Sequence, residues 1–398
     1  MHIQEVPTES STDNHVEVAR NLIPLLQNGA EETERGRRLA PEVSEAMRAS
    51  GLLQVCAPLR AGGSGGNFRD LIEVSAELAR GDGSAGWVAF IANAAAFATS
   101  AFADEVRAEI FADPLNVVVG QYGPNGVATR VDGGYRVTGK WRFASGCYQA
   151  QWTLNGVRIA DDNGEVVARA WALLPLAELE LEDSWHVAGM SGTGSNTLIA
   201  NDVFVRDGFM VDHDTFAGRR FAAWHDDEPQ YRSSMRTVAQ LGIVGPLMGL
   251  AEAAWENILA MMNEGRPIIQ TSYKDIRESP SYRLALGEAR NAIDQGSFHV
   301  FRAADRVDSA ALDGRHLDLG DHARIWGDAS AATKKFRDAV DLLLDIGGTR
   351  SFSVANPLQR IWRDLEIGSR HGLNNRLVNA ERHALGLLDL DRPPLIDG

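Results

Sequence analysis

The stretch GYRVTGKWRFASG, residues 134–146, decides the fold class of this chain. Its β-branched and aromatic residues alternate with polar ones, as in a strand, and Asp132-Gly133-Gly134 at its start is a hairpin signal. Similar short stretches surround it between about residues 116 and 209, separated by Gly, Asn or Asp turns, with no helical pattern between them. We therefore predict a central domain at residues 113–212 that is an antiparallel β-barrel or sandwich.

Helical patterns lie on both sides of this β region. Apolar residues recur at spacings of three and four in FRDLIEVSAELAR, residues 68–80, and residues 86–100 are apolar all round, as in a fully buried helix. Long helical patterns return after residue 233 and predict an antiparallel four-helix bundle. The predicted fold class is α+β, with an N-terminal α-helical domain at residues 1–112 and a C-terminal helical bundle domain at residues 213–398.

The composition excludes several classes of function. The 398 residues include 39 Lys and Arg against 54 Asp and Glu, a net charge of −15, so we expect no binding to nucleic acid or to a membrane surface. No apolar stretch reaches the length of a bilayer span, and the N-terminus lacks the pattern of a secretory signal. Two cysteines cannot build a disulfide framework, and the ten histidines show no metal-ligand spacing. We expect a cytoplasmic enzyme without a metal.

Three motifs resemble functional sites but have simpler interpretations. GDGSAG, residues 81–86, fits the dinucleotide fingerprint, yet a helix rather than a strand precedes it, so we interpret it as a helix C-cap followed by Ser84 as the next N-cap. GGSGG, residues 62–66, fits a nucleophile elbow, which requires alternating strands and helices that this chain lacks. Asp226-Asp227-Glu228 is interpreted as a solvated loop rather than a metal cluster.

Four stretches taken together resemble the acyl-CoA dehydrogenase fold, and most closely its flavin-dependent monooxygenase branch of two-component hydroxylases. They are residues 62–87, KWRFASGCYQAQW at 140–152, WHVAGMSGTGSN with DVFV within 185–205, and PLQRIWRD with a downstream His at 357–371. The resemblance implies reduced FAD as cofactor (FMN is the alternative), a separate flavin reductase as partner and a small-molecule substrate. It implies oxygen transfer through a C4a-(hydro)peroxyflavin, and a homotetramer built as a dimer of dimers.

The predicted flavin site begins at the end of the decisive strand. A flavin ring needs an apolar wall and polar groups near its N5, O4 and N3 edges, and a strand end is a rigid place for them. Phe143, Ala144 and Ser145 stand at that end. By resemblance, Ser145 contacts the N5 edge, while Gln121 and Tyr122 contact the pyrimidine edge and the pocket.

The resemblance implies further cofactor contacts from two distant segments. Trp185 would supply an apolar wall, and Thr193 and Ser195 would border the ribityl chain and the pyrophosphate. Gly347 and Gly348 match a glycine pair that packs near the adenine of a partner chain's flavin, so we expect at least a dimer.

One departure from the dehydrogenases decides the predicted chemistry. Those enzymes commonly carry a Glu eight residues after the Asp of their R-D motif, where this chain has Gly372, eight residues after Asp364. The other Glu site of the fold falls near Val238. Without a carboxylate base, dehydrogenation has no proton acceptor. We predict instead that His371 and Ser145 are catalytic and donate hydrogen bonds to the oxygen-transferring group.

A second departure concerns the substrate. Phenol-hydroxylating relatives carry a His eight residues after the Trp of their GW motif, but Ala95 stands eight residues after Trp87. Asn93 is the polar residue nearby, so we predict Asn93 as a catalytic group on the substrate side, in a pocket with Trp87 and Ala95. Hydroxylation of an aromatic or indole carbon is the first choice. N-oxidation of an amino group, such as that of an amino sugar, an acyl-CoA dehydrogenase-like flavin oxidoreductase and a non-enzymatic flavin binder remain alternatives.

Overall fold

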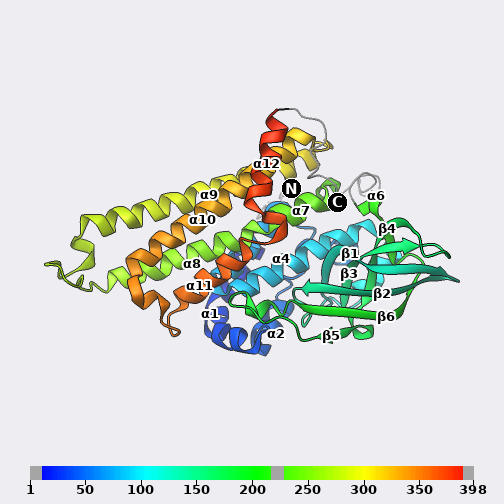
Figure 1. Ribbon diagram of the computed structural model, residues 1–398, viewed down its shortest axis with the longest axis horizontal. Coiled ribbons are helices and arrows are strands. Elements are labelled where there is room, and N and C mark those ends of the chain that lie inside the picture. The colour runs from blue at the N-terminus through cyan, green and yellow to red at the C-terminus, as the bar shows by residue number, and fades with distance from the viewer. Residues whose placement is uncertain (1–10, 217–227, 389–398) are drawn as a thin grey trace, which may run out of the picture.

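The computed structural model describes residues 11–216 and 228–388, and these form helices, a sheet and helices again in chain order (Figure 1). The predicted α–β–α order is confirmed. The N-terminal helices are α1 (Ser11–Gly36), α2 (Pro41–Ala49), α3 (Phe68–Gly81), α4 (Gly83–Ala98) and α5 (Asp104–Ile110).

The central sheet has seven strands in the order β5-β6-β2-β1-β3-β4-β7. They are β1 (Val118–Val131), β2 (Gly134–Ala144), β3 (Trp152–Ala160), β4 (Val166–Pro175), β5 (Glu180–Glu182), β6 (Asn196–Arg206) and β7 (Met210–Asp212). β1 and β3 pair in parallel, so the prediction of an entirely antiparallel domain was wrong at this pair. The reason is that residues 145–151 cross from the end of β2 to the far side of β1, where β3 starts in the direction of β1.

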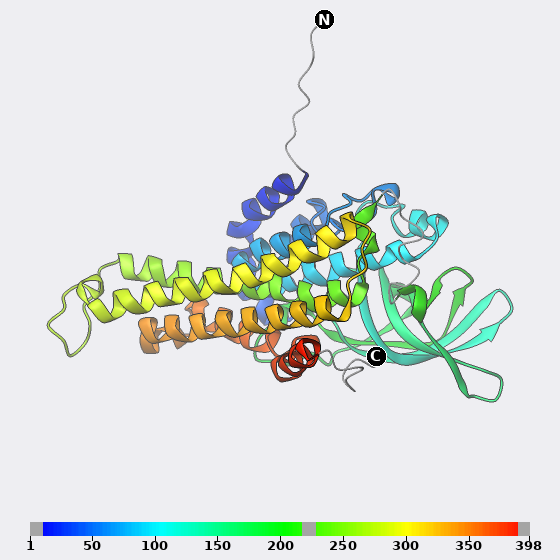
Figure 2. The ribbon, with the colours of Figure 1, turned by 90° about the horizontal axis from the view of Figure 1, so that it is seen from above.

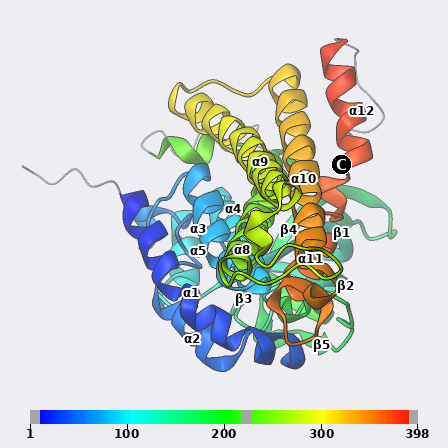
Figure 3. The same cartoon turned by 90° about the vertical axis from the view of Figure 1, so that its left-hand side faces the viewer.

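Helices α6 to α12 follow the sheet, and the longest of them run side by side away from it (Figure 2). Seen from the opposite end of the molecule, α8, α9, α10 and α11 lie close together (Figure 3). The bounds are α6 (His213–Phe216), α7 (Met235–Gly242), α8 (Val244–Asn263), α9 (Pro280–Leu312), α10 (Leu319–Gly347), α11 (Pro357–Gly368) and α12 (Arg376–Leu387).

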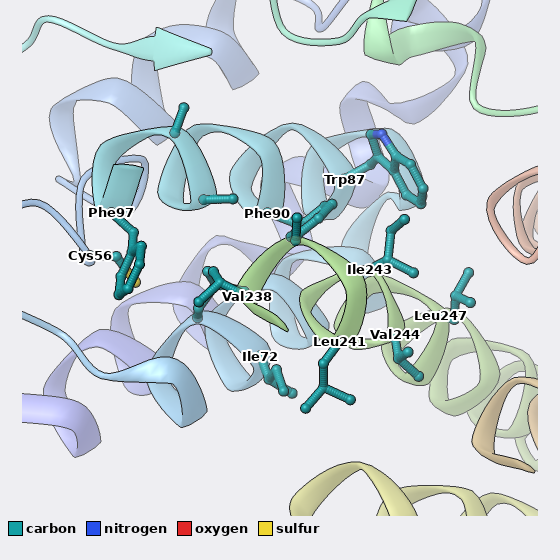
Figure 4. Packing of buried hydrophobic residues seen from close by; sticks show 14 of the residues in the cluster. Cys56, Ile72, Trp87, Phe90, Phe97, Val238, Leu241, Ile243, Val244 and Leu247 are labelled. Atoms are coloured by element: carbon teal, nitrogen blue, oxygen red, sulfur yellow. The ribbon is translucent and has the colours of Figure 1, made fainter. Parts of the chain in front are cut away.

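Helix α4 lies at the centre and carries part of the site. All of its residues except Ile91 are buried, which confirms the helix expected to be buried on every side. Trp87 and Phe90 of α4 belong to one core cluster with Ile243 and Leu247 from the α7–α8 region (Figure 4). The opposite side of α4 packs on β1, so side chains on its first turns reach both the sheet and the C-terminal helices.

The start of α4 corrects one prediction. Asp82, not Ser84, is the N-cap, because the Asp82 carboxylate accepts a hydrogen bond of 2.9 Å from the Ala85 amide. The helix α3 precedes this turn, so the interpretation of GDGSAG as a helix-to-helix junction is confirmed. Of the acidic run at 226–228, only Glu228 is described; it is 4% exposed and accepts from the Leu59 amide, so at this residue the expected solvated loop is wrong.

Two stretches, Gly83–Ala101 and Thr237–Asn263, are long and apolar enough to span a membrane by length and composition alone. Their apolar windows are 89% and 94% buried inside the protein, which makes them core helices of this fold.

Candidate flavin site

Trp87 joins two residues that lie far apart in the sequence. Its indole Nε1 donates a hydrogen bond of 3.3 Å to the hydroxyl oxygen of Ser145, just past the end of β2. Its ring centroid lies 5.7 Å from that of His371, which follows α11. The fold therefore brings Ser145 and His371 into contact with one buried tryptophan, and we take these three residues as the centre of the candidate site.

A chain of hydroxyl groups runs inward from Ser145. The Ser145 and Ser195 Oγ atoms lie 2.7 Å apart, as do those of Ser195 and Thr193, and the Thr193 hydroxyl donates at 2.7 Å to the Met190 carbonyl. A carbonyl can only accept, so the Thr193 proton is used there, Ser195 must donate to Thr193, and Ser145 must donate to Ser195. We call the hydroxyl groups of Ser145, Ser195 and Thr193 the relay. The Met190 carbonyl at its inner end sets the direction of each hydroxyl proton in the relay.

This direction corrects the role predicted for Ser145. Its single proton points inward to Ser195, while its oxygen accepts from Trp87. In this hydrogen-bond network Ser145 presents its oxygen as an acceptor towards a ligand, and its predicted donation to a bound flavin stays a prediction. Sequence reasoning did not find this, because the direction depends on a carbonyl far along the chain.

The loop that carries the inner end of the relay is held in an unfavourable backbone conformation. Met190 has φ 53° and ψ 25°, the left-handed region, which costs a side-chain-bearing residue roughly 1–2 kcal/mol. The Met190 amide donates to the carboxylate of Asp364, and the Met190 carbonyl also accepts from Trp185 Nε1 at 2.9 Å. Side chains outside the turn, Asp364 and Trp185, therefore bond both the N–H and the C=O of Met190 and hold this conformation.

Gly189, one residue earlier, lets this loop lie directly on α11. A Cβ at this position would stand 2.3 Å from the carbonyl oxygen of Arg363, which is backbone and cannot turn aside. We expect Gly189→Ala to lower stability by about 1–3 kcal/mol and to weaken flavin binding, because the loop must move. Thermal melts and flavin titrations check this. The matched control is Gly287→Ala on exposed α9, where nothing lies within 4 Å; unchanged binding in both variants would contradict the expectation.

His371 is poised as a neutral donor. It is solvent-accessible, and its Nδ1 accepts from the Leu373 amide at 3.3 Å, where it caps the short helix η9 (Gly372–Asn374). Although the residue as a whole is exposed, protein packed around its ring disfavours the charged form and lowers the pKa of His371 to about 4. At neutral pH the ring is thus uncharged, and with Nδ1 accepting, the proton resides on Nε2. His371 can donate a hydrogen bond from that atom but carries no spare proton.

Two buried carboxylates lie behind the loop. Asp82 is 6% exposed and Asp364 is 4% exposed. Burial raises the pKa of Asp364 to about 7, with a further contribution from the charge of Asp82, and burial raises the pKa of Asp82 to about 6. Each accepts a backbone amide, from Met190 and Ala85 respectively. Both carboxyl groups therefore hold a proton more tightly than an exposed Asp does.

An exposed aromatic ring marks the face that a flavin would cover. Phe143 is 62% exposed and has φ 65°, a strained conformation for a bulky residue. Its ring meets that of Trp185 edge to face at 5.9 Å. A planar apolar wall beside the lone acceptor of Ser145 fits a reduced flavin, which has a flat ring and carries an N–H at N5.

The other predicted residues of the β domain lie on β1 and at the end of β2. Ala144, 2% exposed, is the last residue of β2 and lies beside Ser145. Gln121, on β1, accepts from the Gly123 amide at 3.1 Å through its side chain. Tyr122 folds back over its own strand, with its hydroxyl 2.7 Å from where a Cβ of Gly120 would stand. Which flavin edge Gln121 and Tyr122 meet stays a prediction.

Asn93 and Ala95, predicted for the substrate pocket, are both buried. The Asn93 side chain is 1% exposed and donates to the carbonyls of Leu52 and Ala89, while it accepts from the Cys56 amide. All of its polar atoms thus tie α4 to the preceding loop. Ala95 is fully buried in the core. The prediction that they contact substrate is not supported by this arrangement, because neither presents accessible surface.

Gly347 and Gly348 lie far from this centre, at the end of α10. Gly348 has φ 61° and ψ −157°, a conformation essentially restricted to glycine. Nearby is an open cavity of about 500 Å³ whose lining includes Arg266, Arg350 and Asn356.

The residues that sequence analysis missed are Asp82, Met190 and Asp364. In the sequence, Asp364 was used only to locate the position of the missing Glu, and Met190 was one residue of a glycine-rich loop. Asp82 carried a usable signal, since a carboxylate directly before a wholly apolar helix must be buried with a partner. Nothing in the sequence indicates a left-handed Met190.

Comparisons with known proteins agree with this geometry. Residues 17–111 match the acyl-CoA dehydrogenase N-terminal domain, and residues 241–376 match the acyl-CoA dehydrogenase C-terminal domain. The chain is 29% identical over 384 residues, 93% of each protein, to the oxygenase component of the FADH2-dependent resorcinol hydroxylase from Rhizobium sp.. It is 27% identical over 347 residues, 85% of each, to the indole-3-acetate monooxygenase of Pseudomonas putida.

One solved structure covers nearly the whole chain. XiaF from Streptomyces sp., determined in complex with FADH2 and glycerol, superposes with a TM-score of 0.92 and 30% sequence identity, over 96% of each chain. The match includes the helices on both sides of the sheet, so the relative placement of the Ser145 and His371 segments is shared with a protein that binds a reduced flavin.

Proposed function

The chain belongs to the acyl-CoA dehydrogenase family and is a flavin-dependent monooxygenase within it, and we propose that it hydroxylates a carbon of an aromatic or indole-type small molecule. It acts as an oxygenase component that uses reduced flavin, FAD first and FMN second, from a separate reductase. We also propose that the protein is cytoplasmic.

The acceptor role of Ser145 is the observation that carries the proposal. Reduced flavin bears an N–H at N5, whereas oxidised flavin has only a lone pair there. Because the Ser145 proton is bonded to Ser195, the Ser145 oxygen can accept a hydrogen bond from the N5–H of reduced flavin. It has no proton to donate to the N5 lone pair of oxidised flavin. Such a site captures flavin after reduction, as an enzyme supplied by a separate reductase requires.

The residues around Trp87 would donate a hydrogen bond to the reacting oxygen, exclude water and hold the site in position. Bound reduced flavin supplies the activation of dioxygen for transfer of one oxygen atom to the substrate. Neutral His371 would donate from Nε2 towards the reacting oxygen, and Phe143 and Trp185, which meet edge to face, would form an apolar wall that excludes water. Trp87 fixes the spacing, since it contacts both Ser145 and His371.

The geometry gives no support to dehydrogenation. The position of the usual Glu is Gly372, and Val238, near the other Glu site, is fully buried. Asp82 and Asp364, the carboxylates behind the loop, are buried and bonded to backbone amides. A proton on a substrate carbon would therefore meet a neutral histidine of low basicity instead of a carboxylate.

The experiment supplies chemically reduced FAD, dioxygen and matched sets of phenols, indoles and primary amines. We expect a product heavier by one oxygen atom on a ring carbon, and no product with oxidised FAD alone. Direct reduction of bound flavin by NADH or NADPH, with no separate reductase, would overturn the two-component assignment. An oxygen found on nitrogen would overturn the carbon-hydroxylation proposal and support N-oxidation.

We further propose that the cavity beside Gly348 receives the adenine end of a partner chain's FAD, next to its pyrophosphate, in a homotetramer. Arg266 and Arg350 supply the positive charge that a pyrophosphate requires. Arg350→Ala is expected to weaken FAD binding about tenfold or more, the worth of one charge-assisted bond, while FMN binding stays unchanged. Flavin titrations and light scattering check this; a monomer, or equal losses for FAD and FMN, would contradict it.

A further inference from the structure

We propose that Gln240 of α7 is a positioning residue of the active site: by holding the carbonyl of Leu373, it fixes the turn that orients the His371 ring. This inference rests on the proposed function, since it concerns the hydrogen-bond donor role proposed there for His371. Gln240 acts through Leu373 and not on the reacting groups.

The amide of Gln240 is buried, and the structure fixes which way it faces. Gln240 is 2% exposed, and the indole Nε1 of Trp326 on α10 donates to its Oε1. An indole N–H can only donate, so the oxygen of the amide must face Trp326 and its NH2 group must face away from it. That NH2 group donates to the Leu373 carbonyl at 3.4 Å and to Asn379 Oδ1 at 3.2 Å.

Asn379 of α12 supplies a second donor to the same carbonyl. It is fully buried, and because its oxygen accepts from Gln240, its Nδ2 is the atom that donates to the Leu373 carbonyl at 3.4 Å. A carbonyl oxygen has two lone pairs, so α7 and α12 together fill both acceptor positions of Leu373. Each bond is long for an N–H···O bond, so the position of this carbonyl depends on both donors.

The ring of Trp326 is held so that its N–H keeps pointing at Gln240. The His322 ring, one turn earlier on α10, stacks on it with centroids 5.9 Å apart and planes 24° apart. The guanidinium carbon of Arg382, on α12, lies 5.2 Å from the Trp326 ring centroid. Helices α7 and α12 both pack on α10. The three helices are thus joined by hydrogen bonds at Gln240.

Leu373 connects this network to His371. Its amide donates to His371 Nδ1 at 3.3 Å, and the Asn374 amide donates to the His371 carbonyl at 2.8 Å. A donor at Nδ1 keeps the proton of the neutral ring on Nε2 and holds the ring in one orientation. Without the bond from Gln240, the turn of residues 371–374 is held less firmly, and the Nε2 proton is no longer aimed in a single direction.

The test measures product formed per dioxygen consumed by Gln240→Met, with reduced FAD and a substrate that the wild type hydroxylates. Methionine fills nearly the same space as glutamine but cannot donate to Leu373. We expect about tenfold less product, comparable with the loss of a group that orients a metal-binding histidine. The dissociation constant of reduced FAD, measured without dioxygen, should stay as in the wild type.

A double variant separates positioning of His371 from damage to the fold. If Gln240 acts through His371, Gln240→Met combined with His371→Ala should form product at the rate of His371→Ala alone, because the two losses are not independent. A loss in the double variant equal to the product of the two single losses would show that Gln240 acts independently of His371, and it would overturn the inference.

Gln54→Met is the matched control for the loss of a buried glutamine. The Gln54 side chain donates to the Asn116 carbonyl and joins the loop after α2 to the segment before β1. This variant should lower the melting temperature and leave product per dioxygen as in the wild type. An equal loss of product in Gln54→Met and Gln240→Met would make the effect one of general stability and overturn the inference.

Asn379→Ala keeps the inference testable if Gln240→Met does not fold. It removes the second donor to the Leu373 carbonyl, so it should also lower product per dioxygen and add nothing to His371→Ala. Wild-type coupling in folded Gln240→Met, or in Asn379→Ala where the first variant does not fold, overturns the inference if His371→Ala is uncoupled. If the wild type forms no hydroxylated product with reduced FAD, the proposed function itself fails.

Discussion

His371→Ala should form product on the order of 10²-fold more slowly while it still binds reduced flavin and consumes dioxygen. The lost group is a neutral imidazole whose Nδ1 is occupied by the Leu373 amide and whose Nε2–H is the available donor. Without that donor, the oxygen is released as hydrogen peroxide instead of entering the substrate. Product formed per dioxygen consumed is the quantity to measure.

A second substitution separates this effect from simple loss of structure. His371 also caps η9, and asparagine is a good N-cap, so His371→Asn should restore the melting temperature without restoring the coupling. Since His371 is already uncharged above about pH 5, the coupling of the wild type should not change between pH 6 and 8 through this residue. Normal coupling in His371→Ala with only a lower melting temperature would make His371 a structural residue.

The second large effect concerns how much more tightly the site binds reduced flavin than oxidised flavin. Ser145→Ala removes the acceptor for the N5–H of reduced flavin and should weaken reduced-flavin binding about tenfold, with little change for oxidised flavin. The substitution also leaves Trp87 Nε1 and the Ser195 oxygen without their present partner. Anaerobic and aerobic titrations of the same variant give the two constants.

Ser195→Ala is the informative companion variant. It removes the acceptor that holds the Ser145 proton, so that proton is free to turn towards the flavin. Oxidised flavin, whose N5 can only accept, should then bind more tightly than in the wild type, while Ser145→Ala should not show this gain. If both variants lose oxidised and reduced flavin equally, the relay does not set the direction of the Ser145 proton.

Several site residues could be named from the sequence, but their roles could not. Ser145, His371 and Trp87 were predicted, and the structure brings all three together. Ser145 was expected to donate, whereas in this hydrogen-bond network its oxygen accepts from Trp87 and its proton lies towards Ser195. Trp87 was expected as a pocket wall and instead bridges the other two. Asn93 was expected near the substrate, yet all its polar atoms are bonded to backbone groups.

The sequence by itself determined what depends on local pattern. Alternating residues at 134–146, the all-round apolar run at 86–100 and Gly372 in place of a base indicated the strand, the buried helix and the absence of dehydrogenase chemistry. Such features can be predicted because the pattern of neighbouring residues determines which secondary structure forms and which of its faces is buried.

Only the tertiary structure decided the chemistry of the site. The parallel pairing of β3 depends on a crossover, the proton direction at Ser145 on the Met190 carbonyl, and the raised pKa of Asp364 on its burial and on the charge of Asp82. Each of these depends on two segments that are distant in the chain. The physical reason is that hydrogen-bond direction and pKa are set by whichever groups share a desolvated space, and sequence order does not record that neighbourhood.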